Sequence, residues 1–417
     1  MLDSQPEGAP RRRPIIVQKY GGSSVADVAK LGRVADRIVA ARRAGSDVVV
    51  VVSAMGKSTD GLLALARQAA AWEGADAAAA DPPRRELDML LSTGERVAMS
   101  LLSIAIQARG FEAISFTGSQ SGILTNDRHF DARIIEVRPH RIEDELARGK
   151  IVIVAGYQGM SYRREITTLG RGGSDTTAVA LAAALEAERC EIYSDVDGVY
   201  SADPRVVGDA AHIPELDHAV LQEMAECGAK VICAQAVEWA RRAGIAIYAR
   251  STFAPEADRA KQTVIRSFAP GETLTARAVV AESNVVLGRL ADAARLEDLL
   301  RAAEAARIAF KDLAIGPRGG AFLIPLLNVP DWRAARQKLL FDLPSLELSE
   351  GTSVVSVVGD GLAATPEPLV RFLGALRSEG AAPLLTTATP LRLSAVIDAP
   401  HADAVQRALH RAFVRGG

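Results

Sequence analysis

The stretch Asp47–Val52, with the sequence DVVVVV, predicts a strand that is buried on both faces of a sheet, because it shows no polar alternation. Outward from it, short apolar runs alternate with segments of helical periodicity. Strands are expected at 14–18, 47–52, 112–116, 151–155, 190–194 and 245–249, and helices at 25–44, 60–72, 86–109, 175–188, 217–227 and 235–244. An Ala/Asp/Pro-rich segment at 73–83 is expected to form a surface excursion. This alternation predicts an α/β fold with a mainly parallel sheet sandwiched by helices, whose ligands bind beyond the carboxyl ends of the strands.

The C-terminal part of the chain contains an internal repeat of two βαββα runs. The first run has strands at 284–290, 308–315, 320–327 and 346–348 with helices at 292–306 and 331–341, and the second has strands at 353–358, 383–387 and 391–397 with helices at 366–378 and 401–413. This order predicts two ferredoxin-like βαββαβ units. The second run lacks a last strand, which the apolar segment 274–281 could supply. We therefore divide the chain into a disordered tail at 1–14, an α/β domain at 15–268, and two small domains at 269–350 and 351–417.

Composition limits the classes of function. The chain has 417 residues, of which 48% are hydrophobic, so it can bury real cores. Its 49 Lys and Arg against 51 Asp and Glu argue against a nucleic-acid partner, which calls for a basic surplus. Three cysteines without a CxxC pair or a His/Cys cluster indicate reduced thiols and no structural zinc. Without a long apolar run or a signal-peptide pattern, we expect a cytoplasmic protein with no membrane partner.

Two glycine-rich loops follow expected strands, KYGGSS at 19–24 and GRGGSD at 170–175. Paired glycines let backbone N–H groups approach an anion, and a helix N-terminus adds partial positive charge. Lys19 supplies a mobile point charge that suits a phosphate, whereas the planar fork of Arg171 suits a carboxylate. Each loop taken alone could be only a tight turn. Two of them, one with a lysine and one with an arginine, favour a site for anionic substrates.

The segment STGE at 92–95 interrupts an otherwise apolar helix. Glu95 could be a surface carboxylate, which is the ordinary interpretation. However, a glycine in the middle of a helix reduces the stability of the helix by about 1 kcal/mol. A residue that is locally unfavourable in this way favours a functional role for the segment. A carboxylate at this position could hold an ammonium group.

The segment YSDVDGVY at 193–200, followed by ADPR at 202–205, is either a polar turn after a strand or an adenine and ribose pocket. In the second interpretation Tyr200 offers a ring face, and Ser194 and Asp195 offer hydrogen bonds. Arg205 would then lie near the phosphates.

Seven segments of the chain occur in an order that is familiar from one enzyme family. They are KYGGSSV, VSAMG, LLSTGER, SFTGSQSGILT, VAGYQG, TTLGRGGSDTTAVALAAAL and CEIYSDVDGVYSADPR. The chain thus resembles the aspartate kinases of the amino-acid kinase superfamily, strongly over 15–253 and only in architecture over 275–414, where that family carries two ACT domains. The resemblance implies phosphoryl transfer from ATP to L-aspartate, giving 4-phospho-L-aspartate, with Mg²⁺ bound through the phosphates. This is the first step of the pathway to lysine and threonine, and the resemblance also implies a homodimer or larger assembly through the ACT-like domains.

The resemblance also implies roles for individual residues. Lys19 and Asp175 would be catalytic. Substrate contacts are implied for Ser53, Thr59, Glu95, Arg171, Gly172, Gly173 and Ser174. ATP contacts are implied for Lys19, Tyr20, Gly21, Gly22, Ser194, Asp195, Tyr200, Arg205, Ala229 and Lys230. This is physically consistent, because phosphoryl transfer needs positioning and charge neutralisation more than a covalent catalyst.

The chain departs from the family pattern at Ala98, where a serine is usual, and at Gln235-Ala236, where Arg-Ser is usual. These changes leave two alternatives to a competent aspartate kinase. One is a non-catalytic regulatory paralogue, and the other is an amino-acid kinase with a shifted acidic substrate.

Regulation is expected to differ as well. In the family, a turn with Asp and a Pro-Gly pair presents backbone N–H groups to an effector amino acid. The equivalent turns here, 290–295 and 362–367, lack that pair, and the opposing strand at 309–312 reads AFKD. A Cβ at those positions restricts the backbone conformation. Weak or absent inhibition by lysine and threonine is therefore expected, although Asp292 and Asp312 remain.

Overall fold

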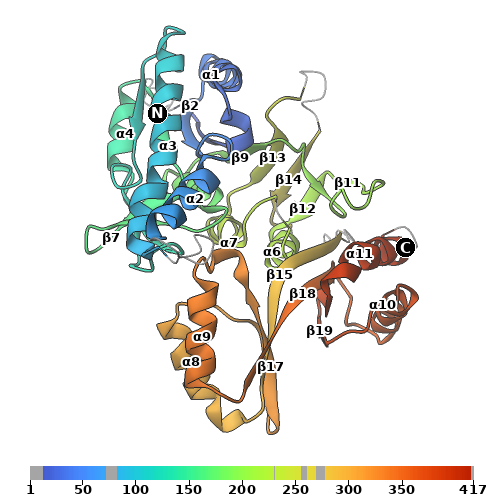
Figure 1. The fold of residues 1–417 in the computed structure, drawn as a ribbon. Coiled ribbons are helices and arrows are strands. Elements are labelled where there is room, and N and C mark those ends of the chain that lie inside the picture. The colour runs from blue at the N-terminus through green and yellow to red at the C-terminus, as the bar shows by residue number, and fades with distance from the viewer. Residues whose placement is uncertain (1–12, 72–81, 230, 255–260, 269–277, 415–417) are drawn as a thin grey trace, which may run out of the picture.

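A computed structural model describes residues 13–71, 82–229, 231–254, 261–268 and 278–414 (Figure 1). Its N-terminal part is built on an eight-stranded sheet with the order β12-β14-β13-β9-β1-β2-β6-β3. The strands are β1 (Ile15–Tyr20), β2 (Asp47–Val52), β3 (Ala113–Phe116), β6 (Ile151–Ala155), β9 (Arg189–Ser194), β12 (Glu215–Asp217), β13 (Ile247–Ser251) and β14 (Gln262–Arg266). All neighbouring pairs from β13 to β3 are parallel, and β14 runs antiparallel to β13. The predicted mainly parallel sheet is confirmed.

The valine run of β2 occupies the middle of this sheet and is buried on both faces. Val49 and Val51 belong to the core beneath α5 (Gly173–Ala184), whereas Val48, Val50 and Val52 belong to the core beneath α1 (Val28–Arg43) and α3 (Arg84–Gln107). Helices α6 (His218–Glu226) and α7 (Ala234–Ala243) join α5 on its face of the sheet, whereas α2 (Ser58–Ala70) packs on the outside against α3. The expected strand and helix positions are confirmed, with shifts of a few residues at their ends.

The first helix needs a correction, because the structure divides the expected segment 25–44. A short 3₁₀ turn at Gly22–Val25 comes first, and α1 then begins after Asp27, whose carboxylate accepts a hydrogen bond from the N–H of Lys30 at 2.8 Å. An aspartate at this position satisfies one of the free N–H groups of the first turn.

Residues 117–170 contain elements that the sequence did not indicate. Strands β4 (Ile123–Thr125), β5 (Ile134–Val137), β7 (Gln158–Ser161) and β8 (Ile166–Thr168) form a small sheet with the order β5-β4-β7-β8, and α4 (His140–Ala147) lies between β5 and β6. Strands of three or four residues are too short to show a period. The excursion expected at 73–83 and the tail at 1–14 lie almost entirely outside the described residues.

The C-terminal part forms one six-stranded antiparallel sheet with the order β16-β17-β15-β18-β20-β19. Its elements are β15 (Ala278–Leu290), α8 (Leu296–Ala305), β16 (Lys311–Gly316), β17 (Gly319–Pro325), α9 (Trp332–Asp342), β18 (Leu346–Val358), α10 (Glu367–Ser378), β19 (Leu385–Thr389), β20 (Arg392–Asp398) and α11 (Ala402–Phe413). Helices α8 and α9 cover one half of the sheet, and α10 and α11 cover the other half (Figure 1). We call this sheet with its four helices the regulatory region.

In two places, segments that were expected as separate strands belong to one long strand. Residues 346–348 and 353–358 both belong to the 13-residue β18. Residues 284–290 and the described part of the segment 274–281 both belong to the 13-residue β15, which begins at Ala278. The first half of β15 pairs with the second half of β18, from Ala278 opposite Val358 to Ser283 opposite Ser353. Asn284 and Gly351 have positive φ angles of 59° and 73°, and the pairing is irregular beside Asn284. Polar and glycine residues at these irregular positions look like strand ends in the sequence, which explains the wrong division.

Among the described residues, α3 alone has the length and apolar composition of a membrane span, but half of its apolar window is buried inside the protein. It packs along α1, β3 and β6. A core helix of a globular domain has these properties.

Candidate active site

The glycine loop after β1 and the loop after β2 meet at the carboxyl edge of the sheet. The N–H of Gly56 donates to the carbonyl of Gly22 at 3.0 Å, and the N–H of Gly21 donates to the carbonyl of Tyr193 at 3.1 Å. A Cβ on Gly22 would lie only 2.8 Å from the carbonyl oxygen of Ala54, so glycine is required there by the close approach of two backbones. The loops after β1 and β2 and the end of β9 thus form one continuous rim.

Lys19 and Asp175 form a buried ion pair at this rim. Lys19 Nζ lies 2.6 Å from Asp175 Oδ1, and the side chains are only 11% and 9% exposed. Lys19 is on β1 and points to the same side as Val17, toward α5, whose first turn carries Asp175. A Cβ on Gly21 would lie 3.5 Å from Lys19 Nζ, so this glycine keeps the space beside the ammonium group free.

Glu95 is buried against the loop after β2. It is 3% exposed, and its Oε1 accepts a hydrogen bond from the N–H of Ala54 at 3.0 Å. Its Oε2 is buried without a hydrogen-bond partner in the described part of the chain. Gly94 permits this approach, because a Cβ there would lie 2.8 Å from the Cβ of Ala54. Burial raises the pKa of Glu95 to about 7, against the opposing effect of the Ala54 hydrogen bond. The interpretation as a surface carboxylate is wrong.

Ser58 is a polar group near Glu95 that the sequence analysis missed. Its Oγ is buried without a partner among the described residues and would lie 3.8 Å from a Cβ on Gly94. Thr59 follows it on the first turn of α2, and Ser53 precedes the same loop, where its N–H donates to the carbonyl of Tyr20 at 3.1 Å. Unsatisfied buried polar atoms carry a free-energy cost that a polar ligand would remove.

The loop at 170–173 leads into α5. Gly172 caps the helix with a φ of 76°, and a Cβ there would lie 2.5 Å from the Cβ of Cys233. Ser174 is buried on the first turn, beside the end of β6, where a Cβ on Gly156 would lie 2.7 Å from Ser174 Oγ. Arg171 stands at the mouth, with its Nη2 3.8 Å from Asp60 Oδ1 and its side chain 62% exposed. A helix N-terminus with an arginine beside it attracts carboxylates.

Tyr157 lies beside the first turns of α5, where its N–H donates a hydrogen bond to the Thr177 hydroxyl at 3.2 Å. Burial raises its pKa, the charge of Glu95 raises it further, and the charge of Arg171 lowers it, so the ring lies within electrostatic range of both. Its Cδ2 would lie 3.1 Å from a Cβ on Gly173, and its backbone adopts a positive φ of 67°. The segment VAGYQG contains it, but the sequence analysis assigned it no role.

Four of the residues expected to contact ATP, Ser194, Asp195, Tyr200 and Arg205, lie at the end of β9 or in the segment that follows it. The carbonyl of Ser194 accepts a hydrogen bond from the N–H of Thr252 at 2.8 Å, and the exposed Asp195 follows. Tyr200 on β10 (Val199–Tyr200) donates its hydroxyl proton to Asp197 at 2.7 Å. Arg205 makes two contacts with Asp203, at 3.0 and 2.7 Å, and its side chain is 78% exposed. Asp203 therefore holds the guanidinium group at the surface.

Four further positions complete the comparison with the expected ATP site. The ring of Tyr20 is fully buried and stacks on Tyr193 with centroids 4.9 Å apart, so only the main chain of Tyr20 is available to a ligand. Lys261, which the sequence did not indicate, donates to the Tyr200 hydroxyl at 3.1 Å and pairs with Asp197 at 2.7 Å. Ala229 follows α6 and is half-buried, whereas Lys230 lies outside the described residues.

The departures from the family pattern fall mainly in the core. Ala98 and Ala236 are both fully buried, in the cores on opposite faces of the sheet. Gln235 is half-buried on the first turn of α7. The alanines therefore fill packed positions in which a serine hydroxyl would need a hydrogen-bond partner.

Comparison with known proteins is consistent with this geometry. The profile of the amino acid kinase family matches residues 14–251. The aspartokinases of Mycolicibacterium smegmatis and Corynebacterium glutamicum are 40% and 39% identical to this chain, each over 97% of both chains. The crystal structure of E. coli aspartokinase III with aspartate and ADP (R-state) superposes with a TM-score of 0.81 at 26% identity, over 96% of this chain and 100% of that chain. The same enzyme with lysine and aspartate (T-state) gives a TM-score of 0.68 at 27% identity, over 96% and 99%. The chain belongs to the aspartokinases, within the amino acid kinase family.

Proposed function

We propose that the protein transfers the γ-phosphoryl group of ATP to the β-carboxylate of L-aspartate, giving 4-phospho-L-aspartate and ADP. The observation that carries the proposal is the buried Lys19–Asp175 pair at the N-terminus of α5, on the same rim as the half-satisfied carboxylate of Glu95. A site of this kind offers a cation for a phosphoryl group and an anion for an ammonium group. The near full-length similarity to aspartokinases supports the same reaction.

In this mechanism an oxygen of the β-carboxylate attacks the γ-phosphorus. The bond from that phosphorus to the bridging oxygen breaks, and ADP leaves with the electron pair. A free aspartate side chain has a pKa of about 3.9 and is already ionised at neutral pH, so no general base is needed. Lys19 neutralises the charge that spreads over the transferring group, and Asp175 holds the ammonium group in place.

The substrate amino acid would be held at both of its ends. Glu95 accepts the ammonium group with its free Oε2, and Arg171 with the first turn of α5 binds the α-carboxylate. The loops that carry Ser194, Asp195, Tyr200 and Arg205 bind the nucleotide. Mg²⁺ would enter on the ATP phosphates and neutralise part of their charge. Within the described ranges no three His, Cys, Asp or Glu side chains gather as a metal site.

The proposal is tested by trapping the acyl phosphate with hydroxylamine. Hydroxamate formation should depend on ATP and L-aspartate, and L-glutamate and N-acetyl-L-glutamate should give little. A preference for either of these would instead establish the shifted-substrate alternative. No hydroxamate and no ADP with any of them would establish the non-catalytic paralogue.

We also propose a cytoplasmic homo-oligomer that is joined through the regulatory region. The edge strand β16 exposes Leu313 and Ile315 and pairs with β17 alone among the described strands. Unpaired edges with apolar side chains favour pairing with another chain. Size-exclusion chromatography with light-scattering detection should give a molar mass at least twice the 44.1 kDa of one chain. A monomer at micromolar concentration would contradict the proposed oligomer.

The pH dependence of aspartate binding should report the ionisation of Glu95. Because only the carboxylate form binds an ammonium group well, the KM for aspartate should fall as the pH rises through about 7. In Glu95→Gln this dependence should disappear, and the KM for aspartate should be high at every pH. Steady-state kinetics from pH 6 to 9 in both proteins measure this, and the same slope in Glu95→Gln would assign the titration to another group.

The raised pKa of Glu95 also affects the free energy of unfolding. Whereas aspartate binding should strengthen as the pH rises, the stability of the fold should decrease. A carboxyl whose pKa is raised on folding, from 4.5 to about 7, holds its proton more tightly in the folded state. The contribution of Glu95 to the free energy of unfolding therefore decreases as the pH rises from 4.5 to about 7, and it is constant above about 7. Urea unfolding at several pH values should show a smaller decrease in Glu95→Gln than in the wild type.

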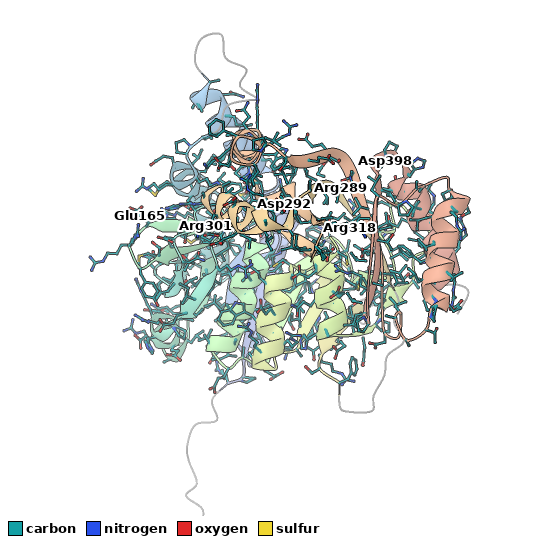
Figure 2. All side chains as sticks on the ribbon, turned by 90° about the horizontal axis from the view of Figure 1, so that it is seen from below. Glu165, Arg289, Asp292, Arg301, Arg318 and Asp398 are labelled. Carbon is teal, nitrogen blue, oxygen red and sulfur yellow. The ribbon has the colours of Figure 1, made fainter. Side chains whose placement is uncertain are left out.

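Lysine and threonine should inhibit this protein weakly or not at all. The carboxylate of Asp292, which is exposed on the near face in Figure 2, accepts a hydrogen bond from the N–H of Ala294 at 2.9 Å and so occupies a group that an effector carboxylate would need. On the opposing strand, Lys311 and Asp312 are both engaged in ion pairs. Activity at saturating ATP with millimolar lysine, threonine and both together measures the effect. Strong inhibition by either one would show a working effector site.

A further inference from the structure

The C-terminus of α6 lies against the regulatory region (Figure 1), where residues of β15, β16 and β20 contact it and the segment that follows it. Glu282 on β15, Lys311 and Asp312 on β16, and Arg392 on β20 supply the charged groups. The contacted segment immediately precedes Ala229, one of the positions expected to contact ATP.

Lys311 makes the closest of these contacts. Its Nζ pairs with Glu282 Oε2 at 2.6 Å and also donates a hydrogen bond to the carbonyl oxygen of Glu226, the last residue of α6. The side chains of Lys311 and Glu282 are only 12% and 15% exposed. The last carbonyls of a helix lack partners within the helix and carry partial negative charge, so a cation there stabilises the helix end.

The chain turns directly after this contact, and the turn rests on β15. The N–H of Ala229 donates to the carbonyl of Met224, and the N–H of Gly228 donates to the carbonyl of Ala225, which are the two bonds of a Schellman cap. Gly228 has a φ of 98°, and a Cβ there would lie 2.7 Å from the Cβ of Glu282. The direction in which Ala229 leaves the helix is therefore set by Gly228 together with the Glu282–Lys311 pair.

Arg392 forms a second anchor, on the preceding turn of α6. Its guanidinium group lies 3.0 Å from Glu223 and 2.5 Å from Asp312, and it contacts the Sγ of Cys227 at 3.8 Å. Arg392 is 8% exposed. This anchor holds the body of the helix, whereas Lys311 holds its last carbonyl.

We propose that Lys311, buttressed by Glu282, is a positioning residue for nucleotide binding: it fixes the end of α6 so that the Gly228–Ala229 turn presents its main chain to ATP. The inference rests on the proposed function, because it assumes that Ala229 borders the nucleotide. It assigns to a regulatory-region lysine a role on the ATP side of the reaction, with no part in binding aspartate. It also gives Lys311 a use other than effector binding.

The test compares Lys311→Met with Lys338→Met, a control lysine that pairs with Asp342 at 3.0 Å on α9. Methionine keeps the length of the side chain but removes the charge. For Lys311→Met we expect the KM for ATP to rise about tenfold, as loss of one charge-assisted hydrogen bond gives. The KM for aspartate and kcat should stay within about twofold of the wild type, and Lys338→Met should change none of the three. Lys311→Arg, which can restore both contacts, should recover most of the ATP affinity.

A direct measurement separates this inference from the proposed function. Calorimetric titration with ATP, with no aspartate present, should show the weaker binding of Lys311→Met whichever substrate the protein phosphorylates. An unchanged ATP dissociation constant overturns the inference and leaves the reaction untouched. Absence of aspartate-dependent ADP formation in the wild type overturns the reaction instead. An equal rise in the KM values for both substrates would show a merely structural role and would also overturn the inference.

Glu282→Gln provides a second, milder variant. It leaves Lys311 in place but removes its counter-ion, so ATP binding should weaken by a smaller factor in the same direction. If Lys311→Met does not fold, Glu282→Gln is the test: weakened ATP binding in this variant supports the inference, and unchanged ATP binding overturns it.

Discussion

Replacing Lys19 by methionine is expected to reduce kcat by about 100-fold or more, because the charge that develops on the transferring phosphoryl group loses its buried partner. Lys19 Nζ forms an ion pair with Asp175, and both side chains are about 90% buried. A group of this kind is already oriented before the reaction, so its removal affects the transition state directly. Initial rates of ADP formation at saturating ATP and aspartate measure the effect.

The control must separate loss of catalysis from loss of folding. Removing one partner of a buried ion pair leaves an uncompensated charge, which is strongly destabilising. The double variant Lys19→Met/Asp175→Asn removes both charges and should recover stability without recovering turnover. Lys150→Met, which breaks a pair with Glu145 at 2.7 Å on the other side of the domain, should retain activity. Turnover near that of the wild type in a folded Lys19→Met protein would refute the assigned role.

Arg171→Ala is expected to raise the KM for aspartate by about 10- to 100-fold, the range for loss of a hydrogen-bonded charge pair. The KM for ATP should change far less. Arg171 stands at the mouth of the site, 3.8 Å from Asp60 and beside the N-terminus of α5, where a carboxylate is favoured from both sides. Steady-state kinetics with each substrate varied in turn measure the two constants.

An exposed arginine of the same domain provides the comparison. Arg163 forms a similarly loose contact with Asp127, at 3.6 Å, so Arg163→Ala controls for the loss of a surface charge. It should leave both constants unchanged. Equal effects of Arg171→Ala on the two substrates would place Arg171 on the phosphate side of the site.

The sequence predicted the α/β architecture well because its strongest signal, the valine run of β2, lies at the centre of the sheet. It also indicated Glu95, because the neighbouring Gly94 is unfavourable in the middle of a helix. The structure shows that this glycine is needed for the close approach of the helix to Ala54. The pairing of Lys19 with Asp175 could not be derived in the same way. It depends on the parallel order of β1 beside β9 and on the position of α5, which local patterns do not contain.

The wrong and missed elements have equally physical reasons. Asn284 and Gly351 resemble strand ends in the sequence, but the strands continue through them with positive φ angles. Tyr157 shows no pattern of its own, and its packing beside Gly173 at the start of α5 depends on the tertiary fold. Lys311 belongs to the AFKD segment at 309–312, and local patterns do not contain its contact with the carbonyl of Glu226, a residue 85 positions earlier in the chain.

The two long strands also determine how the C-terminal region can be divided. Residues 278–283 of β15 have residues 353–358 of β18 as their neighbours, so the backbone of the first unit is completed by that of the second. A stop codon near residue 350 would strip this half of β15 of its hydrogen-bonded partner and expose Val279, which packs with Val355 and Leu393. The two units are therefore not interchangeable modules. A chimaera that imports a foreign sensor has to exchange both together, from a junction before Ala278 to the C-terminus.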